Sequence, residues 1–211
     1  MDSMARAASP RPYHHGELRE ALVAAGRRLL EEEGLRGFTL RECARRAEVS
    51  HAAPAHHFAS IDDLLAEIAT RGYRELIAVM EAEARRAGPQ PTARLVAQGV
   101  GYMAFAAAHP ALFQLMFNRE ASRFETPGLA AAAKQAYQLQ LDAVDAVIPK
   151  APAERRKRMA DFAWATVHGF ITLVLEGQIG EGESGRALKA RSLAMLAAMA
   201  ETVVRVGGTP D

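Results

Sequence analysis

Apolar side chains recur at helical spacing along most of the chain. The first such stretch begins at Glu17 and places five apolar residues on one face of a helix: Leu18, Leu22, Ala25, Leu29 and Leu30. Gly34 follows, and glycine is common just past the end of a helix because it adopts left-handed backbone angles easily. The pattern predicts a first helix over residues 17–33. Residues 1–12, with Arg6 and Arg11, have no periodicity and are predicted to form an arm.

Two capping boxes mark the next helix starts. Thr39 and Glu42 have the spacing of a reciprocal cap, with Phe38 placed to pack on Cys43, and they predict a helix over 40–47. Ser60 and Asp63 repeat the signal ahead of a long helix over 61–86. Between the two, Ser50 is the expected cap of a very short third helix, which ends by Phe58 and Ala59.

Proline and glycine divide the rest of the chain into further helices. The expected ranges are 92–108, 110–118, 127–148, 153–176 and 186–206. The last two carry apolar residues on more than one face, which is more than a small domain can cover. We therefore expect them to pair with their copies as a two-fold four-helix bundle, which makes the protein a homodimer.

Composition supports an all-α fold in two parts. Hydrophobic residues make up 49% of the 211 residues and aromatic residues only 6%. Abundant Ala, with Leu, Arg and Glu, favours helix because Ala loses no side-chain entropy there. The predicted division is a three-helix domain over 13–60 and a larger domain over 61–211, joined by the long helix that begins at 61.

The net charge of +1 neither supports nor excludes a nucleic-acid partner. The single Cys43 is most simply a small buried hydrophobe, and no thiolate metal cluster or disulfide framework can form within one chain. No apolar run of about 18 residues predicts a membrane span, and the N-terminus has no apolar signal sequence. We expect a cytoplasmic protein without a cofactor or a bound metal.

The short helices have the features of a helix-turn-helix. Such a motif needs a small residue on its first helix, a tight turn, and a hydrophobe that ties the second helix to the first. Ala44, the Glu48-Val49 pair and Phe58 stand at those places. Small side chains and histidines on the second helix suit the major groove of double-stranded DNA, and arginines on the first suit phosphates. The expected outward-facing second-helix residues are His51, Ala52, Ala53, Ala55 and His56. The full set of expected DNA contacts is Thr39, Arg41, Arg46, Ser50, His51, Ala52, Ala53, Ala55, His56 and His57.

A plain three-helix bundle with solvated histidines explains the same periodicity, and the spacing alone does not decide between the two. The sequence between Tyr13 and Tyr73 resembles the N-terminal domain of TetR-family regulators along its whole length. The stretches that carry the resemblance are FTLR from Phe38, ARRAEVS from Ala44, HFAS from His57, and the Leu64-Leu65 pair. Further on, WATVHG from Trp164 is similar to the Trp-His-Gly signature of one TetR C-terminal subfamily. The resemblance implies a transcriptional regulator, commonly a repressor, that binds a pseudo-palindromic operator and responds to a small molecule.

Two positions depart from the family pattern. Glu48 stands where the turn usually has Gly, which costs about 1 kcal/mol if the residue is left-handed. Ala55 replaces a usual aromatic residue of the recognition helix, so either affinity is weaker or His56 and His57 take over the contact. Pro54 keeps that helix short.

Other functions remain as alternatives. No paired carboxylates, Ser-His-Asp set, phosphate loop or His-x-x-x-His pair predicts an enzyme, so we expect no catalysis. An interaction protein that has lost DNA binding is the other alternative, suggested by Glu48 and Ala55.

Large, soft and aromatic side chains in the second domain suit a cavity, and the family resemblance implies that such a cavity receives the effector. Methionine adapts to irregular shapes and aromatic rings give flat walls, although plain core packing accounts for any one of them as well. The expected lining is Met80, Met103, Phe105, Met116, Phe117, Tyr137, Phe162, Trp164 and His168, with Phe124 and Met159 of the same kind. His168 or Tyr137 is the expected polar anchor. Gly169 is expected to let another helix approach closely, and effector binding is expected to swing the helix over 61–86.

Overall fold

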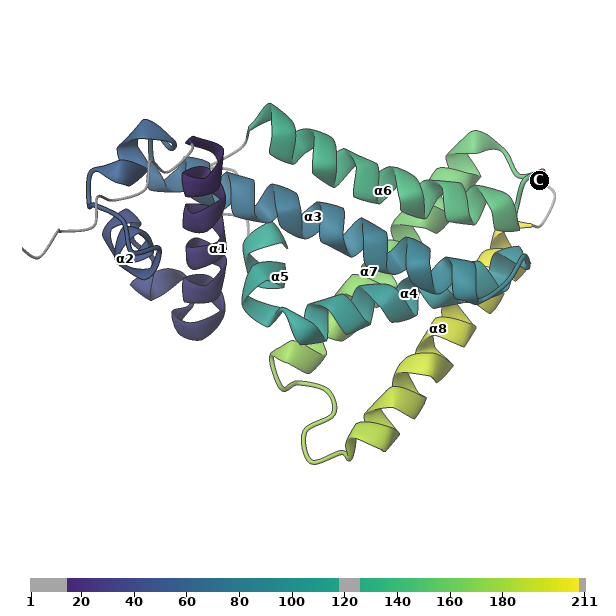
Figure 1. Cartoon of the computed structure of the whole chain (residues 1–211). Coiled ribbons are helices and arrows are strands. Elements are labelled where there is room, and N and C mark those ends of the chain that lie inside the picture. The colour runs from purple at the N-terminus through teal and green to yellow at the C-terminus, as the bar shows by residue number, and fades with distance from the viewer. Residues whose placement is uncertain (1–14, 118–125, 209–211) are drawn as a thin grey trace, which may run out of the picture. The chain divides into compact units, whose positions relative to one another are not determined.

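The computed structural model describes residues 15–117 and 126–208, and over these it is all-helical, as predicted. The predicted arm, with Arg6 and Arg11, lies outside the described residues, and so does Phe124. The described part contains eight α-helices and two short 3-10 helices (Figure 1). Their bounds are α1 His15–Glu33, η1 Leu35–Gly37, α2 Leu40–Arg46, η2 Ala53–His56, α3 Ile61–Arg86, α4 Pro91–Ala108, α5 Pro110–Phe117, α6 Pro127–Val147, α7 Ala153–Leu175 and α8 Gly185–Gly207.

The chain divides into two compact units, the first ending at Leu64 and the second beginning at Leu65. The boundary falls within α3, whose first residues belong to the first unit and whose remainder belongs to the second. Each unit has its own buried core.

The first unit is built on the face of α1 that the apolar spacing predicted. Leu22, Ala25, Leu29 and Leu30 have no exposed surface, while Leu18 is half-buried. They form one core with the buried side chains of Phe38, Cys43, Ala44 and Phe58, and α1 contacts α2 directly. Burial in this core raises the pKa of the Cys43 thiol to about 11, which keeps it protonated and unreactive.

Both capping boxes place helix starts where the sequence predicted them. The Ser60 backbone N–H donates to the Asp63 carboxylate, and the Asp63 N–H donates to the Ser60 hydroxyl, so this box is reciprocal. At α2, the Glu42 N–H donates to the Thr39 hydroxyl at 3.1 Å. The Glu42 carboxylate instead accepts hydrogen bonds from Arg45 and Arg46, so only half of the predicted box forms there.

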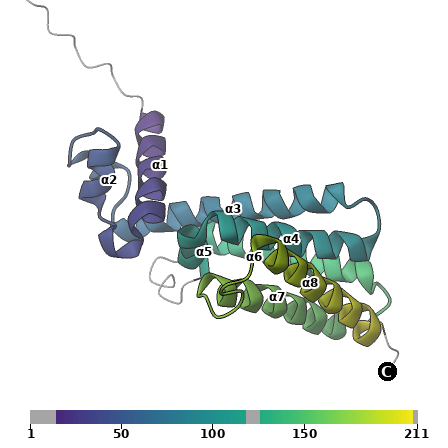
Figure 2. The same cartoon turned by 90° about the horizontal axis from the view of Figure 1, so that it is seen from below.

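In the second unit, α4 is the central helix and contacts α5, α6, α7 and α8. Figure 2 shows α8, in yellow-green, lying across α4 and α7. Gly101 on α4 permits a close approach to α3, because a Cβ there would lie 3.1 Å from the Met80 Cα. Within the described ranges no single helix is long and apolar enough to span a membrane, and α4 and α5 reach that composition only as a pair bent by 109°.

Candidate functional sites

The turn after α2 places Glu48 in the left-handed region, with φ 57°. The Val49 N–H donates to the Ala44 carbonyl at 3.0 Å and closes this turn. Among the described residues Glu48 is the one non-glycine residue with positive φ. Side chains other than glycine are disfavoured there, so the turn holds local strain.

The segment after the turn differs from the expected third helix. It is the single-turn 3-10 helix η2, which starts at Ala53 rather than Ser50, and no side chain caps it. Its hydrogen bonds join residues three apart, as from the Ala53 N–H to the Ser50 carbonyl and from the His57 N–H to the Pro54 carbonyl. Pro54 has no N–H with which to close an α-helical turn onto Ser50, and it restricts the residue before it.

This change of helix type turns one predicted contact inward. Ala53 is only 8% exposed, so the prediction that it faces outward is wrong. The other four residues expected on this face are exposed: His51, Ala52, Ala55 and His56. Thr39, Arg41 and Ser50 are exposed as well, and His57 is half-buried. Small side chains flanked by histidines therefore make up the exposed surface of η2 and the turn before it.

Arg46 is held within the unit rather than presented to solvent. Its guanidinium forms ion pairs with Glu32 and Glu33 of α1 and, through Nε at 3.0 Å, with Glu42. The side chain is 17% exposed, and these carboxylates raise its pKa. Arg46 therefore joins α1 to α2, and little of its side chain is exposed for the expected phosphate contact, which stays a prediction. Hydrogen bonds from Arg45 and then Arg46 lower the pKa of Glu42 to about 2.

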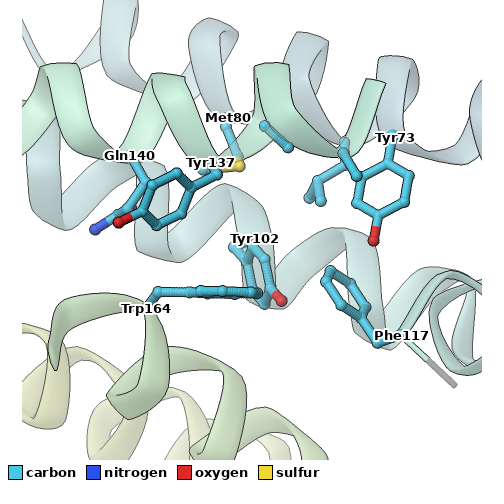
Figure 3. Close-up of a pocket in the computed structure, with 10 residues that line it drawn as sticks. Tyr73, Met80, Tyr102, Phe117, Tyr137, Gln140 and Trp164 are labelled. Carbon is cyan, nitrogen blue, oxygen red and sulfur yellow. The ribbon is translucent and has the colours of Figure 1, made fainter. Parts of the chain in front are cut away.

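The second unit contains an apolar cavity of about 110 Å³ between α3, α4, α5, α6 and α7 (Figure 3). Four of the predicted residues line it: Met80, Phe117, Tyr137 and Trp164. The lining also contains six residues that were not predicted: Tyr73, Leu76, Tyr102, Ala133, Ala136 and Gln140. Spacings of three and four from Tyr73 through Leu76 to Met80 put these residues on one face of α3, and that regularity could have revealed them.

The remaining predicted lining residues lie elsewhere. Met103, Phe105 and Met116 are buried in the core and do not line this cavity, so the competing explanation of plain packing holds for them. Phe162 is 37% exposed on α7, and Met159 lies where a Cβ on Gly207 would meet it. His168 does not line this cavity, but it contacts Tyr102, which does.

One hydrogen bond stands at the edge of this cavity. The Tyr102 hydroxyl bonds to His168 Nδ1 at 2.8 Å. Burial raises the pKa of Tyr102 and lowers the pKa of His168, so both groups are neutral near pH 7. Trp164 and His168 do share a face of α7, with ring centroids 6.2 Å apart.

The hydroxyl of Tyr137, one of the two expected polar anchors, already has a partner within the chain. The hydroxyl donates to the Asp161 carboxylate at 2.7 Å, and this bond raises the pKa of Tyr137 to about 12. Its ring faces Trp164, with centroids 6.0 Å apart. In Figure 3 the Trp164 ring lies flat beneath Tyr137, and Gln140 lies beside them.

The outer faces of α7 and α8 carry large exposed apolar side chains. Besides Trp164, which lines the cavity and is 40% exposed, five of them are between 37 and 47% exposed: Phe162, Leu173, Leu193, Val204 and Val206. Gly169 lies between Phe162 and Leu173 at helical spacing, and a Cβ there would meet nothing within 4 Å. Among the described residues, therefore, no close packing of another helix on Gly169 is found, and the expected close approach stays a prediction.

Both units match family models. Residues 22–68 match the model described as bacterial regulatory proteins of the tetR family, and residues 95–199 match the tetracyclin repressor-like C-terminal domain. This order of two domain models is that of a DNA-binding transcriptional regulator with a ligand-binding domain. The chain belongs to the TetR family of transcriptional regulators, which bind DNA and carry ligand-binding domains.

Solved structures resemble the whole chain. A protein of unknown function from Rhodococcus sp. RHA1 is 31% identical, with a TM-score of 0.77 over 95% of this chain and 100% of its own. A transcriptional regulator from Rhodococcus sp. Rha1 is 23% identical, with a TM-score of 0.65 over 92% and 99%. The multidrug binding protein EbrR, complexed with imidazole, is 15% identical, with a TM-score of 0.60 over 92% and 96%. A comparison with curated proteins gave no match.

Proposed function

We propose that this protein is a homodimeric repressor that binds a pseudo-palindromic operator and leaves it when a small hydrophobic or aromatic effector binds. The observation that carries the proposal is the match of both units, in order, to the DNA-binding and C-terminal models of one family. A regulator that acts on bacterial DNA works in the cytoplasm, and it needs no catalytic step. For this reason we propose that the protein is cytoplasmic and that it is not an enzyme.

DNA is contacted through the exposed surface of η2 and the turn before it. Ala52 and Ala55 give the backbone room to approach the major groove, and their methyl groups suit thymine methyls. His51 and His56 flank them and donate to base acceptors or phosphates. Arg41 binds phosphate, with Thr39, Ser50 and His57 in supporting contacts.

The dimer forms through α7 and α8. Their exposed apolar residues recur at helical spacing, and burying large apolar side chains stabilises each one by about 1.5–3 kcal/mol. A glycine inside a helix costs about 1 kcal/mol relative to alanine, and none of the described residues lies where a Cβ on Gly169 would meet it. A partner helix packed against Gly169 explains why this position lacks a side chain.

The cavity among Tyr73, Tyr102, Phe117, Tyr137 and Trp164 receives the effector. Its aromatic walls suit a flat apolar group, and the amide of Gln140 supplies a polar contact. The protein EbrR, whose structure holds imidazole, shows that a similar fold binds a small ring.

The helix α3 links effector binding to release from DNA. It begins at Ile61 in the DNA-binding unit, and further along it carries Tyr73, Leu76 and Met80 in the cavity wall. An effector that favours a different position of this wall shifts α3 and, with it, the spacing of the two DNA-binding units.

A mobility-shift assay on the DNA upstream of the protein's own gene tests the proposal. The expected result is a discrete complex that survives excess unrelated DNA and dissociates on addition of a small aromatic compound. If the protein binds that DNA no better than unrelated DNA, and genome-wide selection of bound fragments also yields no common sequence, the chain is an interaction protein and the proposal is wrong.

A further inference from the structure

A second cavity adjoins the aromatic one and differs from it in chemistry. It measures about 300 Å³ and lies between the C-terminal parts of α5 and α7. Its lining mixes apolar and polar side chains: Phe113, Gln114, Phe117, His168, Thr172, Leu175 and Glu176. Phe117 lines both cavities.

The two cavities share a thin wall. The Phe117 ring centroid lies 4.7 Å from that of His168, in the second cavity, and 6.4 Å from that of Trp164, in the first. The hydrogen bond from Tyr102 to His168 closes the same wall at 2.8 Å. The two cavities therefore meet at Phe117 and at the Tyr102–His168 pair.

The hydrogen bond with Tyr102 fixes the tautomer of His168. A buried hydroxyl needs a partner for its own proton, and Tyr102 finds one at His168 Nδ1. The His168 proton then resides on Nε2, and burial keeps the ring uncharged by lowering its pKa. His168 thus adds no positive charge to the second cavity.

Among the described residues that line this cavity, Glu176 is the one with a charged side chain. It is the C-cap of α7, where the partial negative charge of the helix end disfavours an anion. Helix stability therefore gives no reason for a carboxylate there. The exposed Glu176 carboxylate and the partial negative charge of the α7 C-terminus both favour a cation at this end of the second cavity.

We propose that the second cavity binds the cationic end of an amphiphilic effector whose aromatic ring occupies the first cavity. The inference rests on the proposed function, because it names the chemical class of the effector of that site. A cavity of about 150 Å³ holds benzene in another protein, so the 110 Å³ space suits a single ring after slight adjustment. The ammonium group is attracted to Glu176 and faces the Phe117 ring, while an aromatic carboxylate is repelled.

Four probes with the same ring test this class: 2-phenylethylamine, 2-phenylethanol, phenylacetate and ethylbenzene. Binding is measured on the full-length protein by the fluorescence of Trp164, the single tryptophan of the chain, and by the shift in thermal unfolding midpoint. We expect the Kd of the amine to be about tenfold lower than that of phenylacetate, which corresponds to about 1.4 kcal/mol. Equal affinities, or tighter binding of phenylacetate, overturn the proposal.

Glu176→Gln identifies the group responsible. We expect this variant to raise the Kd of the amine about fivefold, since a single charge-assisted contact is lost. The Kd of ethylbenzene should stay within about twofold of the wild-type value. Glu154→Gln, at the opposite end of α7, is the matched control and should change neither. If Glu176→Gln leaves the preference for the amine intact, the second cavity does not bind the cation.

The outcomes separate this inference from the proposed function. If ethylbenzene and 2-phenylethanol bind and the amine binds no more tightly than they do, the aromatic cavity is still supported as the effector site. The proposal of a cationic effector is then wrong. If none of the four probes changes the Trp164 fluorescence or the unfolding midpoint at millimolar concentration, the aromatic cavity is not the effector site, and both proposals fail.

Discussion

The Tyr73 hydroxyl donates a hydrogen bond of 2.9 Å to the backbone carbonyl of Met116, near the end of α5. The ring of Tyr73 also lines the aromatic cavity, and burial raises its pKa to about 12. Next to it, Gly72 lets α5 pack closely, because a Cβ there would lie 2.6 Å from the Met116 sulfur. One residue of α3 therefore forms a cavity wall and ties that helix to α5.

Tyr73→Phe should break this tie and leave the cavity wall in place. Loss of the bond leaves a buried carbonyl without its donor, which lowers the free energy of unfolding by about 1 kcal/mol. We also expect a change in the effector concentration needed for release from DNA, since α3 is less firmly held. Urea unfolding and a release assay measure the two effects.

Tyr137→Phe is the matched control for Tyr73→Phe, because its hydroxyl bonds to an exposed carboxylate of Asp161. It should cost less stability than Tyr73→Phe. A Tyr73→Phe variant with wild-type stability and wild-type release would show that the Met116 bond does not couple the cavity to α3.

Glu48→Gly should stabilise the protein by about 1 kcal/mol. Glycine adopts the φ of 57° without the steric cost that a side chain pays there. The neighbouring Ala47 has φ −83°, so Ala47→Gly should destabilise instead. Thermal unfolding of the two variants measures the contrast, and a lower midpoint for Glu48→Gly would contradict the strain assigned to this turn.

The helices themselves were predictable because their limits are set locally. The Ser60 and Asp63 cap, the prolines that open α4, α5 and α6, and the apolar face of α1 are all visible within a few residues of sequence. These signals act through nearby hydrogen bonds and fixed backbone angles, so they need no knowledge of tertiary packing.

The errors arose where the outcome depends on how helices meet. Ala53 turned inward because Pro54 favours a 3-10 helix, whose three residues per turn place side chains differently from an α-helix. Arg46 was predicted from its own helix alone, whereas Glu32 and Glu33 of α1 decide its position. Phe105 on α4 and Trp164 on α7 are similar in type. Only the packing of each helix on its neighbours buries Phe105 and leaves Trp164 at a cavity.

The ion pairs of Glu42 should make stability fall at low pH. Its pKa is lowered from 4.5 to about 2 by the two arginines, so its contribution is complete above pH 4.5 and is lost as the pH falls toward 2. We expect Glu42→Gln to unfold at lower urea than wild type at pH 6 and to approach wild type near pH 2.

Glu201→Gln, which removes an exposed carboxylate from α8, is the control for Glu42→Gln and should leave the pH dependence nearly unchanged. The assignment fails if the difference between Glu42→Gln and wild type is the same at both pH values.

Gly169→Leu should weaken the dimer without unfolding the subunit. The position is open within the chain, and a helical leucine is favoured over glycine by about 0.8 kcal/mol. Gly185→Ala, at the start of α8 and also open, is the control. Sedimentation should show dissociation at a higher concentration for Gly169→Leu alone. A wild-type chain that sediments as a monomer at micromolar concentration would contradict the dimer.

Arg41→Ala should impair DNA binding, whereas Arg46→Ala should impair the stability of the fold. Arg41 is exposed, so its loss should weaken binding to all DNA sequences and reduce the slope of log affinity against log salt by about 1. Arg46 holds α1 to α2, so its loss should lower the unfolding midpoint. If Arg46→Ala keeps full stability and flattens the salt dependence, Arg46 is a phosphate contact after all.

A footprint on the upstream DNA tests the central claim most directly. A dimer with two helix-turn-helix units should protect two half-sites related by a two-fold axis, with centres about one helical turn or a small multiple apart. Replacement of both His51 and His56 should alter the preference among operator variants. Protection of a single half-site, or protection with no symmetry that these replacements leave unchanged, would contradict the account.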